Sequence, residues 1–461
     1  MEKKEAIRDA RQLGIPKMLI LGLQHMFAMF GATILVPILI NSYYKGEGIS
    51  VQVTLFMAGA GTLFFHLVTK RKVPAFLGSS FAFLGGYATV AALNTGIYAG
   101  MPMHEKMAYA NGGVVVAGLM YLILALIIKL VGVNKVMRYL PPVVTGPIII
   151  CIGLSLAPSA ISNASTNWFI AIIAFAVVVI FNIWGKGMFK IIPILMGVLI
   201  SYVVAVIMNG MGMTNADGSA ILDFASVASA KVVSIQPFFL CKFDITAVLV
   251  MAPISIASMM EHIGDISAIS ATVGENFLSD PGLHRTLMGD GLATSLSALF
   301  GGPANTTYGE NTGVLELSRV HDPRVIRLAA IYAIILSFSP KFAEVIGTMP
   351  ASIIGGVSFI LYGMISAIGV RNVVENKVDF TKSRNLIIAA VILVSGLGFS
   401  DGLTFQVGGA TVTLTSLAIA SILGILLNAI LPGKDYVFEE KSVAAVKNDV
   451  MLDKDEREHI R

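Results

Sequence analysis

The stretch from Gly301 to Arg319, GGPANTTYGENTGVLELSR, is polar and rich in small residues, although it lies inside a very apolar chain. The Gly-Gly-Pro triplet at its start ends any helix that arrives from the preceding residues. Asn305 to Tyr308 predict a short extended segment, and a helix is expected from about Glu310. Non-helical backbone at membrane depth is tolerated only inside protein or along a cavity. The stretch therefore predicts a solute site in a transporter.

The rest of the chain has the composition of a polytopic membrane protein. Of its 461 residues, 56% are hydrophobic and 13% are charged, against about 25% charged residues in an average soluble domain. Long runs such as 114–128 and 168–183 are nearly free of charge. Cys151 and Cys241 lie in or near apolar runs and predict small buried side chains. No cleavable signal peptide is expected, because the first apolar run is long enough to span.

Fourteen segments are predicted to cross the membrane, so the expected fold is an all-α polytopic membrane protein. They cover residues 17–41, 51–69, 74–95, 111–130, 137–157, 167–184, 191–209, 244–264, 284–300, 303–318, 325–347, 350–369, 385–399 and 412–431. The third and tenth segments each contain a broken stretch rich in small residues, so they are the weakest as plain helices.

The lysines and arginines orient these segments. With the N-terminus inside, 27 of the 32 fall in cytoplasmic segments, and only 5 face outside, at Lys45, Lys106, Lys231, Lys242 and Lys341. Because Lys and Arg concentrate on the cytoplasmic side, both termini are predicted to be cytoplasmic and the number of spans even. The charged residues after Gly433 predict a solvated tail.

The two halves of the chain resemble each other. Gln24-His25 in the first segment corresponds to Glu261-His262 in the eighth, and LPPVVTGPIII (140–150) corresponds to MPASIIGGVSF (349–359). LGSSFAFLGG (77–86) likewise corresponds to the broken stretch of the tenth segment. Seven segments are an odd number, so the two copies have opposite topology, which predicts an inverted repeat.

Few ionisable residues lie inside the segments, where they are costly and usually face a cavity or a partner. Glu261 and Asp265 are four residues apart and share a helix face, Glu310 heads the helix of the tenth segment, and His25 lies in the first. We interpret them as a site for a polar solute and a proton. A planar solute with carbonyl oxygens and ring N–H groups suits carboxylates and free helix N–H groups, and the ring of Phe81 would stack on it.

Each of these residues also has a purely structural explanation. Asp265 would be hydrated if its helix ended nearby, and Glu310 would cap the start of its helix. His25 would be a packed, hydrogen-bonded histidine. Phe81 and Tyr362 would be ordinary core aromatics. Glu261 is the hardest to explain in this way, because it lies deep in its segment.

Several motifs resemble the nucleobase–ascorbate transporter family. They are TTYGENTGVLELSR (306–319), QHMFAMFGATILVP (24–37), PAFLGSSFAF (74–83), EHIGD (261–265) and DPGLHR (280–285). The resemblance extends from about residue 15 to about residue 435 and is closest to the uracil branch of the family.

The resemblance implies two inverted repeats of seven segments, with short antiparallel strands in segments 3 and 10 that meet around the solute. It implies a core domain at 17–130 and 244–348 and a gate domain at 131–210 and 349–432. Residues 1–16 would form a cytoplasmic N-terminus, 211–243 an extracytoplasmic connector and 433–461 a cytoplasmic tail. Members are commonly dimers, in which the core moves against the gate like an elevator.

The resemblance also implies roles for particular residues. The residues that bind or line the substrate site correspond to Phe81, Glu261, Tyr308, Gly309, Glu310 and Tyr362. In this comparison the carboxylates of Glu261 and Glu310 hold the pyrimidine ring, and backbone amides at Phe81, Gly309 and Glu310 contact its carbonyls. Proton coupling would involve Glu261, Asp265, His25 and Glu310.

The implied function is import of uracil with a proton across the cytoplasmic membrane. Glu310 favours uracil, because xanthine and urate members usually have Gln there. Asp265 stands where the uracil branch has His and purine members have Asp, so a xanthine or purine-base:cation symporter is the alternative, and sodium coupling stays open. The expected partners are uracil, protons, the lipid bilayer and a second copy of the chain; no cofactor, metal or nucleic acid is expected.

Three other classes fit the sequence less well. An anion transporter of related fold would favour a basic residue near the half-helices and often carries an appended soluble domain. An enzyme is disfavoured because HExxH, GxSxG and clustered metal ligands are missing from the sequence. A passive channel would need no titratable site at the midplane.

Overall fold

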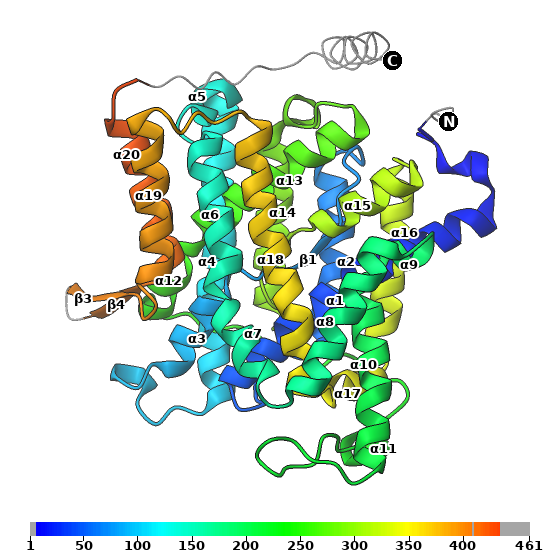
Figure 1. Cartoon of the computed structure of the whole chain (residues 1–461). Coiled ribbons are helices and arrows are strands. Elements are labelled where there is room, and N and C mark those ends of the chain that lie inside the picture. Colours follow the sequence, from blue (N-terminus) through cyan, green and yellow to red (C-terminus); the bar gives the residue numbers. More distant parts are fainter. Residues whose placement is uncertain (1–5, 408–409, 434–461) are drawn as a thin grey trace.

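The computed structural model describes residues 6–407 and 410–433, and the described chain is mostly helical (Figure 1). The first five residues lie outside this description, as does the expected tail apart from Gly433. The helices are α1 (Ile15–Tyr43), α2 (Val51–Val68), α3 (Leu84–Ala92), α4 (Met103–Val131), α5 (Val133–Met137), α6 (Pro142–Ser155), α7 (Ala157–Ala164), α8 (Trp168–Trp184), α9 (Met188–Ile191), α10 (Pro193–Gly210), α11 (Ala225–Ser229), α12 (Ile245–Met251), α13 (Ile254–Val273), α14 (Leu283–Leu299), α15 (Gly309–Ser318), α16 (Pro323–Ser337), α17 (Pro340–Gly347), α18 (Ala351–Glu375), α19 (Ser383–Gly398) and α20 (Ser416–Ile430). The strands are β1 (Leu77–Ser79), β2 (Asn305–Thr307), β3 (Leu403–Val407) and β4 (Ala410–Leu414), and three short helical turns are η1 (Ala10–Leu13), η2 (Gly96–Tyr98) and η3 (Leu278–Gly282).

A helix lies in each of the fourteen predicted segments. The expected breaks are confirmed, because β1 precedes α3 in the third segment and β2 precedes α15 in the tenth. By length and composition, seven helices of the described residues could cross a membrane, or eight if the bent pair α16–α17 is one span; α8, α19 and α20 are shorter apolar helices. The chain is thus a mostly helical polytopic membrane protein, and its fourteen-span topology stays a prediction.

Two expected boundaries are wrong. The fourth segment is predicted from residue 111, but α4 begins at Met103, so Lys106 is buried within a helix instead of lying in an outer loop. The last segment is predicted from residue 412, but that residue belongs to β4, which pairs with β3 as a hairpin. The β-branched residues of TFQV and TVTL favour strands there. Helix α20 begins only after Thr415, whose hydroxyl accepts from the N–H of Ala418.

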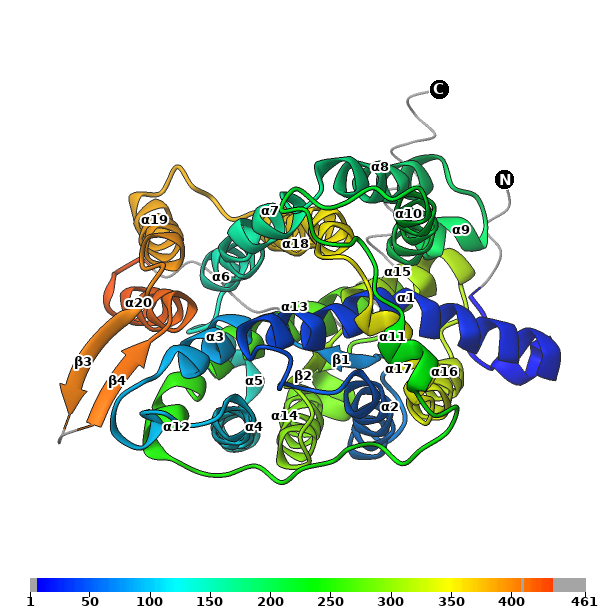
Figure 2. The ribbon, with the colours of Figure 1, turned by 90° about the horizontal axis from the view of Figure 1, so that it is seen from below.

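The long helices form two groups (Figure 2). In one group α2, α4, α14 and α16 pack side by side and carry β1 and β2, and the other contains α6, α8, α10, α18, α19 and α20. Helices α1 and α13 run between the groups, and α13 contacts α6 and α20 on one side and α4 and α14 on the other. A site on α13 therefore lies where the two groups meet.

The segment before α1 binds the connection between α15 and α16. Ile7 pairs with Val320 in a parallel bridge, and the N–H of Ala10 donates to Asp322 Oδ2 at 2.8 Å. The side chains of Ala10, Val320 and Val325 form a small buried apolar cluster beneath these bonds. We call residues 7–11, together with 320–324, the N-terminal clasp.

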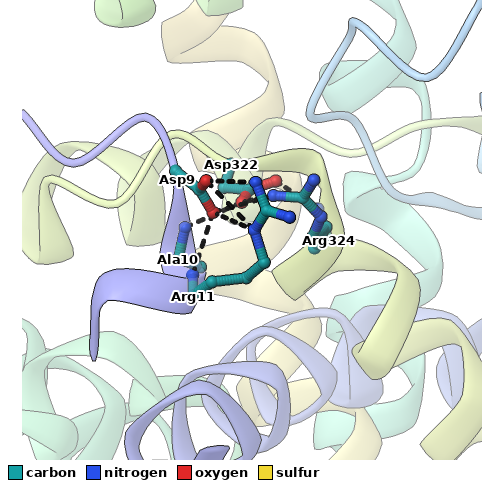
Figure 3. A network of polar contacts seen from close by, with 5 residues as sticks. All are labelled: Asp9, Ala10, Arg11, Asp322 and Arg324. Carbon is teal, nitrogen blue, oxygen red and sulfur yellow. Dashed lines mark hydrogen bonds and ion pairs between the residues drawn. The ribbon is translucent and has the colours of Figure 1, made fainter. Parts of the chain in front are cut away.

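Charged side chains complete the N-terminal clasp (Figure 3). Arg324 Nη1 lies 2.9 Å from Asp9 Oδ1 and 3.0 Å from Asp322 Oδ2. The hydrogen bonds from Arg11 lower the pKa of the Asp9 carboxyl from 3.8 to about 2. The N-terminal clasp thus holds the far end of α15, whose first residues belong to the candidate site.

Candidate functional site

Strands β1 and β2 form an antiparallel pair deep inside the protein. Their register places Leu77 opposite Thr307, Gly78 opposite Thr306 and Ser79 opposite Asn305. This confirms the expected short antiparallel strands. Each strand is soon followed by a short helix, α3 of 9 residues or α15 of 10, and neither helix has a side-chain cap at its N-terminus. The first N–H groups of such helices are donors for an oxygen-bearing or anionic ligand.

Two threonines form hydrogen bonds with the backbone groups on the outer edges of this small sheet. Thr62 of α2 accepts from the N–H of Leu77 at 2.9 Å, and its hydroxyl proton lies between the carbonyl of Ala58 at 2.8 Å and that of Leu77 at 3.3 Å. Thr294 of α14 does the same for Asn305, accepting from the N–H at 3.2 Å and donating to the carbonyl at 2.9 Å. Because an unpaired buried backbone group is costly, these hydroxyls allow a two-stranded sheet to stand inside a helical protein.

Tyr308 braces the two strands. A Cβ atom on Gly78 would lie 2.3 Å from Tyr308 Cζ, so the ring rests directly on the glycine. The hydroxyl of Tyr308 donates to the carbonyl of Ser79 at 2.9 Å, and its N–H donates to the carbonyl of Phe76 at 3.0 Å. Glycine is required at position 78 because any side chain would displace this ring.

A cavity of about 30 Å³ lies beside the strand pair. It is lined by Phe81, Ile149, Glu261, Asp265, Thr306, Thr307, Tyr308, Gly309, Glu310, Ile365 and Ile368. Six of these are residues that the sequence singles out: Phe81, Glu261, Asp265, Tyr308, Gly309 and Glu310. The sequence reasoning misses the two threonines, which lie inside the quoted stretch, and the three isoleucines, which come from α6 and α18 and have no local signal.

Three carboxyl groups converge on this cavity. Asp265 is only 6% exposed and accepts a hydrogen bond from Thr307 Oγ1 at 2.9 Å. Helix α13 continues eight residues beyond Asp265, to Val273. Asp265 is therefore not at the hydrated end of a span. Glu261 lies one turn earlier on the same helix face, and its Oε2 is buried without a hydrogen-bond partner. Glu310 is in the first turn of α15.

Tyr362 and His25 lie just outside the cavity. The ring of Tyr362 packs edge-on against Phe81, with 5.8 Å between centroids. His25 of α1 is fully buried, and its Nδ1 lies 3.2 Å from the amide nitrogen of Asn311, the residue after Glu310. His25 thus contacts the site helix α15, and a direct role in coupling stays a prediction.

A second, larger cavity of about 220 Å³ shares Gly309 and Glu310 with the first. It passes between α1, α10 and α15 to the exposed Lys190 of α9, and Asn182 also lines it. Glu310 therefore stands where the two cavities meet. In the part of the chain that the structure describes, no three His, Cys, Asp or Glu side chains are grouped as a metal site would need.

Comparison with known proteins places the chain among permeases. It is 39% identical over 439 residues to the uracil permease of Bacillus caldolyticus, covering 91% of this chain and 94% of that protein. It is 36% identical over 421 residues to the uracil permease of Escherichia coli (strain K12), covering 89% and 90%.

Solved structures share the fold. The transmembrane domain of the cyanobacterium bicarbonate transporter BicA matches with a TM-score of 0.57 and 16% identity over 82% of this chain and 96% of that chain. SLC26A9 matches with a TM-score of 0.62 and 11% identity over 90% of this chain and 64% of that chain. At these identities the likeness concerns the fold alone.

The model of the Permease family (Xan_ur_permease) matches residues 16–404, which include both strands and all three carboxyl groups of the cavity. With this match and the relatives above, the chain belongs to the Permease family.

Proposed function

We propose that this transporter imports uracil together with a proton across the cytoplasmic membrane. The observation that carries the proposal is the meeting of three carboxyl groups with the uncapped N-terminus of α15 at one buried cavity. Uracil carries ring N–H groups that suit carboxylate acceptors and carbonyl oxygens that suit backbone N–H donors. The relatives named as uracil permeases support the same substrate.

Glu261 and Glu310 are assigned to the ring N–H groups of the substrate, and Phe81 to its face. The first N–H groups of α15 are assigned to a carbonyl oxygen. Asp265 and Glu261 are the proposed proton acceptors, because two carboxylates one turn apart in a buried site cannot both stay ionised at low cost. Proton binding would then favour the substrate-bound site, which is the condition for coupling.

The proposed architecture is two inverted repeats of seven spans. Supporting it, Thr62 satisfies β1 from the helix that precedes it, and Thr294 satisfies β2 from the helix that precedes that strand. The proposed core domain (17–130 and 244–348) carries both strands, and the proposed gate domain (131–210 and 349–432) supplies Ile149, Ile365 and Ile368. Elevator-like movement between them, and a homodimer, complete the proposal.

The proposed orientation places both termini in the cytoplasm. Lys190 lies in a segment predicted to face the cytoplasm, and it lines the larger cavity that leads to Glu310. We therefore assign this structure to a state in which the site communicates with the cytoplasm.

The test is uptake of labelled uracil into proteoliposomes under an inward proton gradient. Wild-type protein should accumulate uracil, and Glu261→Gln should lose accumulation by about tenfold or more, because the amide cannot accept the proton. Glu316→Gln, on the same helix as Glu310 but lining neither cavity, is the control. Wild-type uptake without any response to the gradient would refute proton coupling.

A purine base is the second candidate, and the place of Asp265 in the cavity favours it. Xanthine competition with uracil uptake separates the two. Competition by xanthine but not by uracil analogues would reverse the assignment. Uptake that follows a sodium gradient instead would replace the proton as the coupling ion.

A further inference from the structure

Behind the cavity, a chain of buried polar side chains leads away from Asp265. Thr307 Oγ1 donates to Asp265 Oδ2 at 2.9 Å, and the same oxygen lies 3.5 Å from His262 Nδ1. His262 Nδ1 lies 3.0 Å from Asp290 Oδ2 of α14. His262 and Asp290 are both 0% exposed, and neither lines either cavity. The mechanism proposed above does not use them.

The inner end of this chain has unused hydrogen-bonding capacity. His262 Nε2 and Asp290 Oδ1 have no hydrogen-bond partner, and Asp290 Oδ2 faces His262 Nδ1. A fully buried carboxylate next to an imidazole is expensive unless it is paired with a charge. A proton held between the imidazole of His262 and the carboxyl of Asp290 lowers this cost.

The groups that surround the pair come from every packed element. Asp290 interacts electrostatically with Tyr121 of α4 and with Glu261 and Asp265 of α13. Glu310 of α15 also interacts electrostatically with Glu261 and Asp265. From α2 the ring of Phe65 packs edge-on against His262. Among these surrounding groups, the imidazole of His262 is the base that faces Asp290, at 3.0 Å.

We propose that Asp290 and His262 form a second proton position behind the substrate carboxyls, joined to Asp265 through the hydroxyl of Thr307. In the forward transfer the imidazolium gives its Nδ1 proton to Thr307 Oγ1, while Thr307 gives its own hydroxyl proton to the Asp265 carboxylate. Thr307 is regenerated, His262 keeps its Nε2 proton, and Asp265 becomes the neutral acid. One proton moves and no other reactant is needed.

This inference rests on the proposed proton coupling and assigns Asp290 as a positioning residue for the proton, without contact to substrate. Asp290→Asn should therefore spare the substrate site. Full-length protein in proteoliposomes should bind uracil within about threefold of wild type and sustain uracil counterflow at equal pH, whereas accumulation driven by an inward proton gradient should fall by about tenfold.

His262→Gln, at a residue that lines neither cavity, makes an independent break in the chain, and it decides the matter if Asp290→Asn does not fold. It should show the same split between retained counterflow and lost accumulation. Thr286→Val removes a buried hydroxyl from α14 that bonds only the carbonyl of Leu283, so it is the matched control and should keep proton-driven accumulation.

The outcomes separate the two proposals. If Asp290→Asn accumulates uracil with the pH profile of wild type, the second proton position is wrong and proton coupling stands. If wild type shows no proton-driven accumulation, both fail. If Thr286→Val loses coupling as Asp290→Asn does, the effect is general to α14 and the assignment is overturned.

Discussion

At the scale of single residues, Lys106 is a buried charged side chain that fixes the C-terminal end of α3. Lys106 is 5% exposed, and its ammonium donates to the carbonyls of Ala91 and Leu93 at 3.2 and 2.6 Å, at the end of α3. A cation there also compensates the partial negative charge at the C-terminal end of α3, which is favourable. Lys106→Met should cost about 1–3 kcal/mol, because two buried carbonyls lose their donor. Thermal unfolding in detergent measures this, with the exposed Lys231→Met as control; equal melting temperatures for both would contradict it.

Gly78 makes a sharper prediction at the same scale. Gly78→Ala places a methyl group 2.3 Å from the ring of Tyr308, so the ring must move and its bond to Ser79 is lost. Uracil binding should weaken by about tenfold, since the strand pair shapes the cavity. Gly85→Ala, where nothing lies within 4 Å of the new methyl group, serves as control. Unchanged affinity in Gly78→Ala would show that Tyr308 is not needed as a brace.

At the scale of elements, Thr62 and Thr294 do the same task for the two strands. Thr294→Val leaves the buried N–H and carbonyl of Asn305 unpaired, and Thr62→Val leaves the buried N–H of Leu77 unpaired, which should cost about 1–3 kcal/mol in each case. Serine keeps the hydroxyl and should recover most of the loss. Chemical or thermal unfolding of all four variants tests this. A valine variant as stable as its serine partner would mean that the strand edges find other donors.

The N-terminal clasp is a second element whose behaviour follows from charge. Asp9→Asn removes the carboxylate that Arg11 and Arg324 share, so trypsin should cleave after Arg8 and Arg11 faster than in wild type. Asp217→Asn, which changes an exposed carboxylate elsewhere, is the control. Slower or equal cleavage in Asp9→Asn would argue that the backbone bonds alone hold the segment.

The same carboxyl fixes the pH range of the clasp. The pKa of Asp9 falls from 3.8 to about 2 on folding, so its contribution is fully present above about pH 4 and is lost as the pH falls through about 2. Spin-label distances between residues 6 and 275 should be constant from neutral pH to about pH 4 and widen below it. If the distance already widens near neutral pH, a group other than Asp9 controls the opening of the N-terminal clasp.

At the scale of the whole molecule, orientation gives a test of both topology and state. Lys190→Cys, in a background without Cys151 and Cys241, should react with a membrane-impermeant maleimide only from the cytoplasmic side, because it lines the cavity that leads to Glu310. Lys45→Cys should react only from the other side. Labelling of both from one side would overturn the predicted orientation.

Local signals predict the broken segments and the pair of carboxyl groups on α13, and the failures of such signals share one cause. The Gly-Gly-Pro triplet at residue 301 predicts the break before β2, and the four-residue spacing predicts that Glu261 and Asp265 share a face. Thr294 and Asp290 carry no such signal, because their partners lie on other elements. Lys106 was assigned to a loop, because a buried lysine paired with helix carbonyls looks in sequence like any charged residue near a span.

The pairing of β1 with β2 has a consequence for the biogenesis of the protein. The strands are separated by more than 200 residues of chain, and each lies in a different half. While the ribosome is still translating the second half, the first half sits in the bilayer with its strand edge unmatched. The strand pair is therefore completed only after Thr307 has been inserted, late in synthesis. Such long-range contacts form slowly and expose nascent chains to misassembly, so the candidate site is also a point at which a half-made chain differs from a finished transporter.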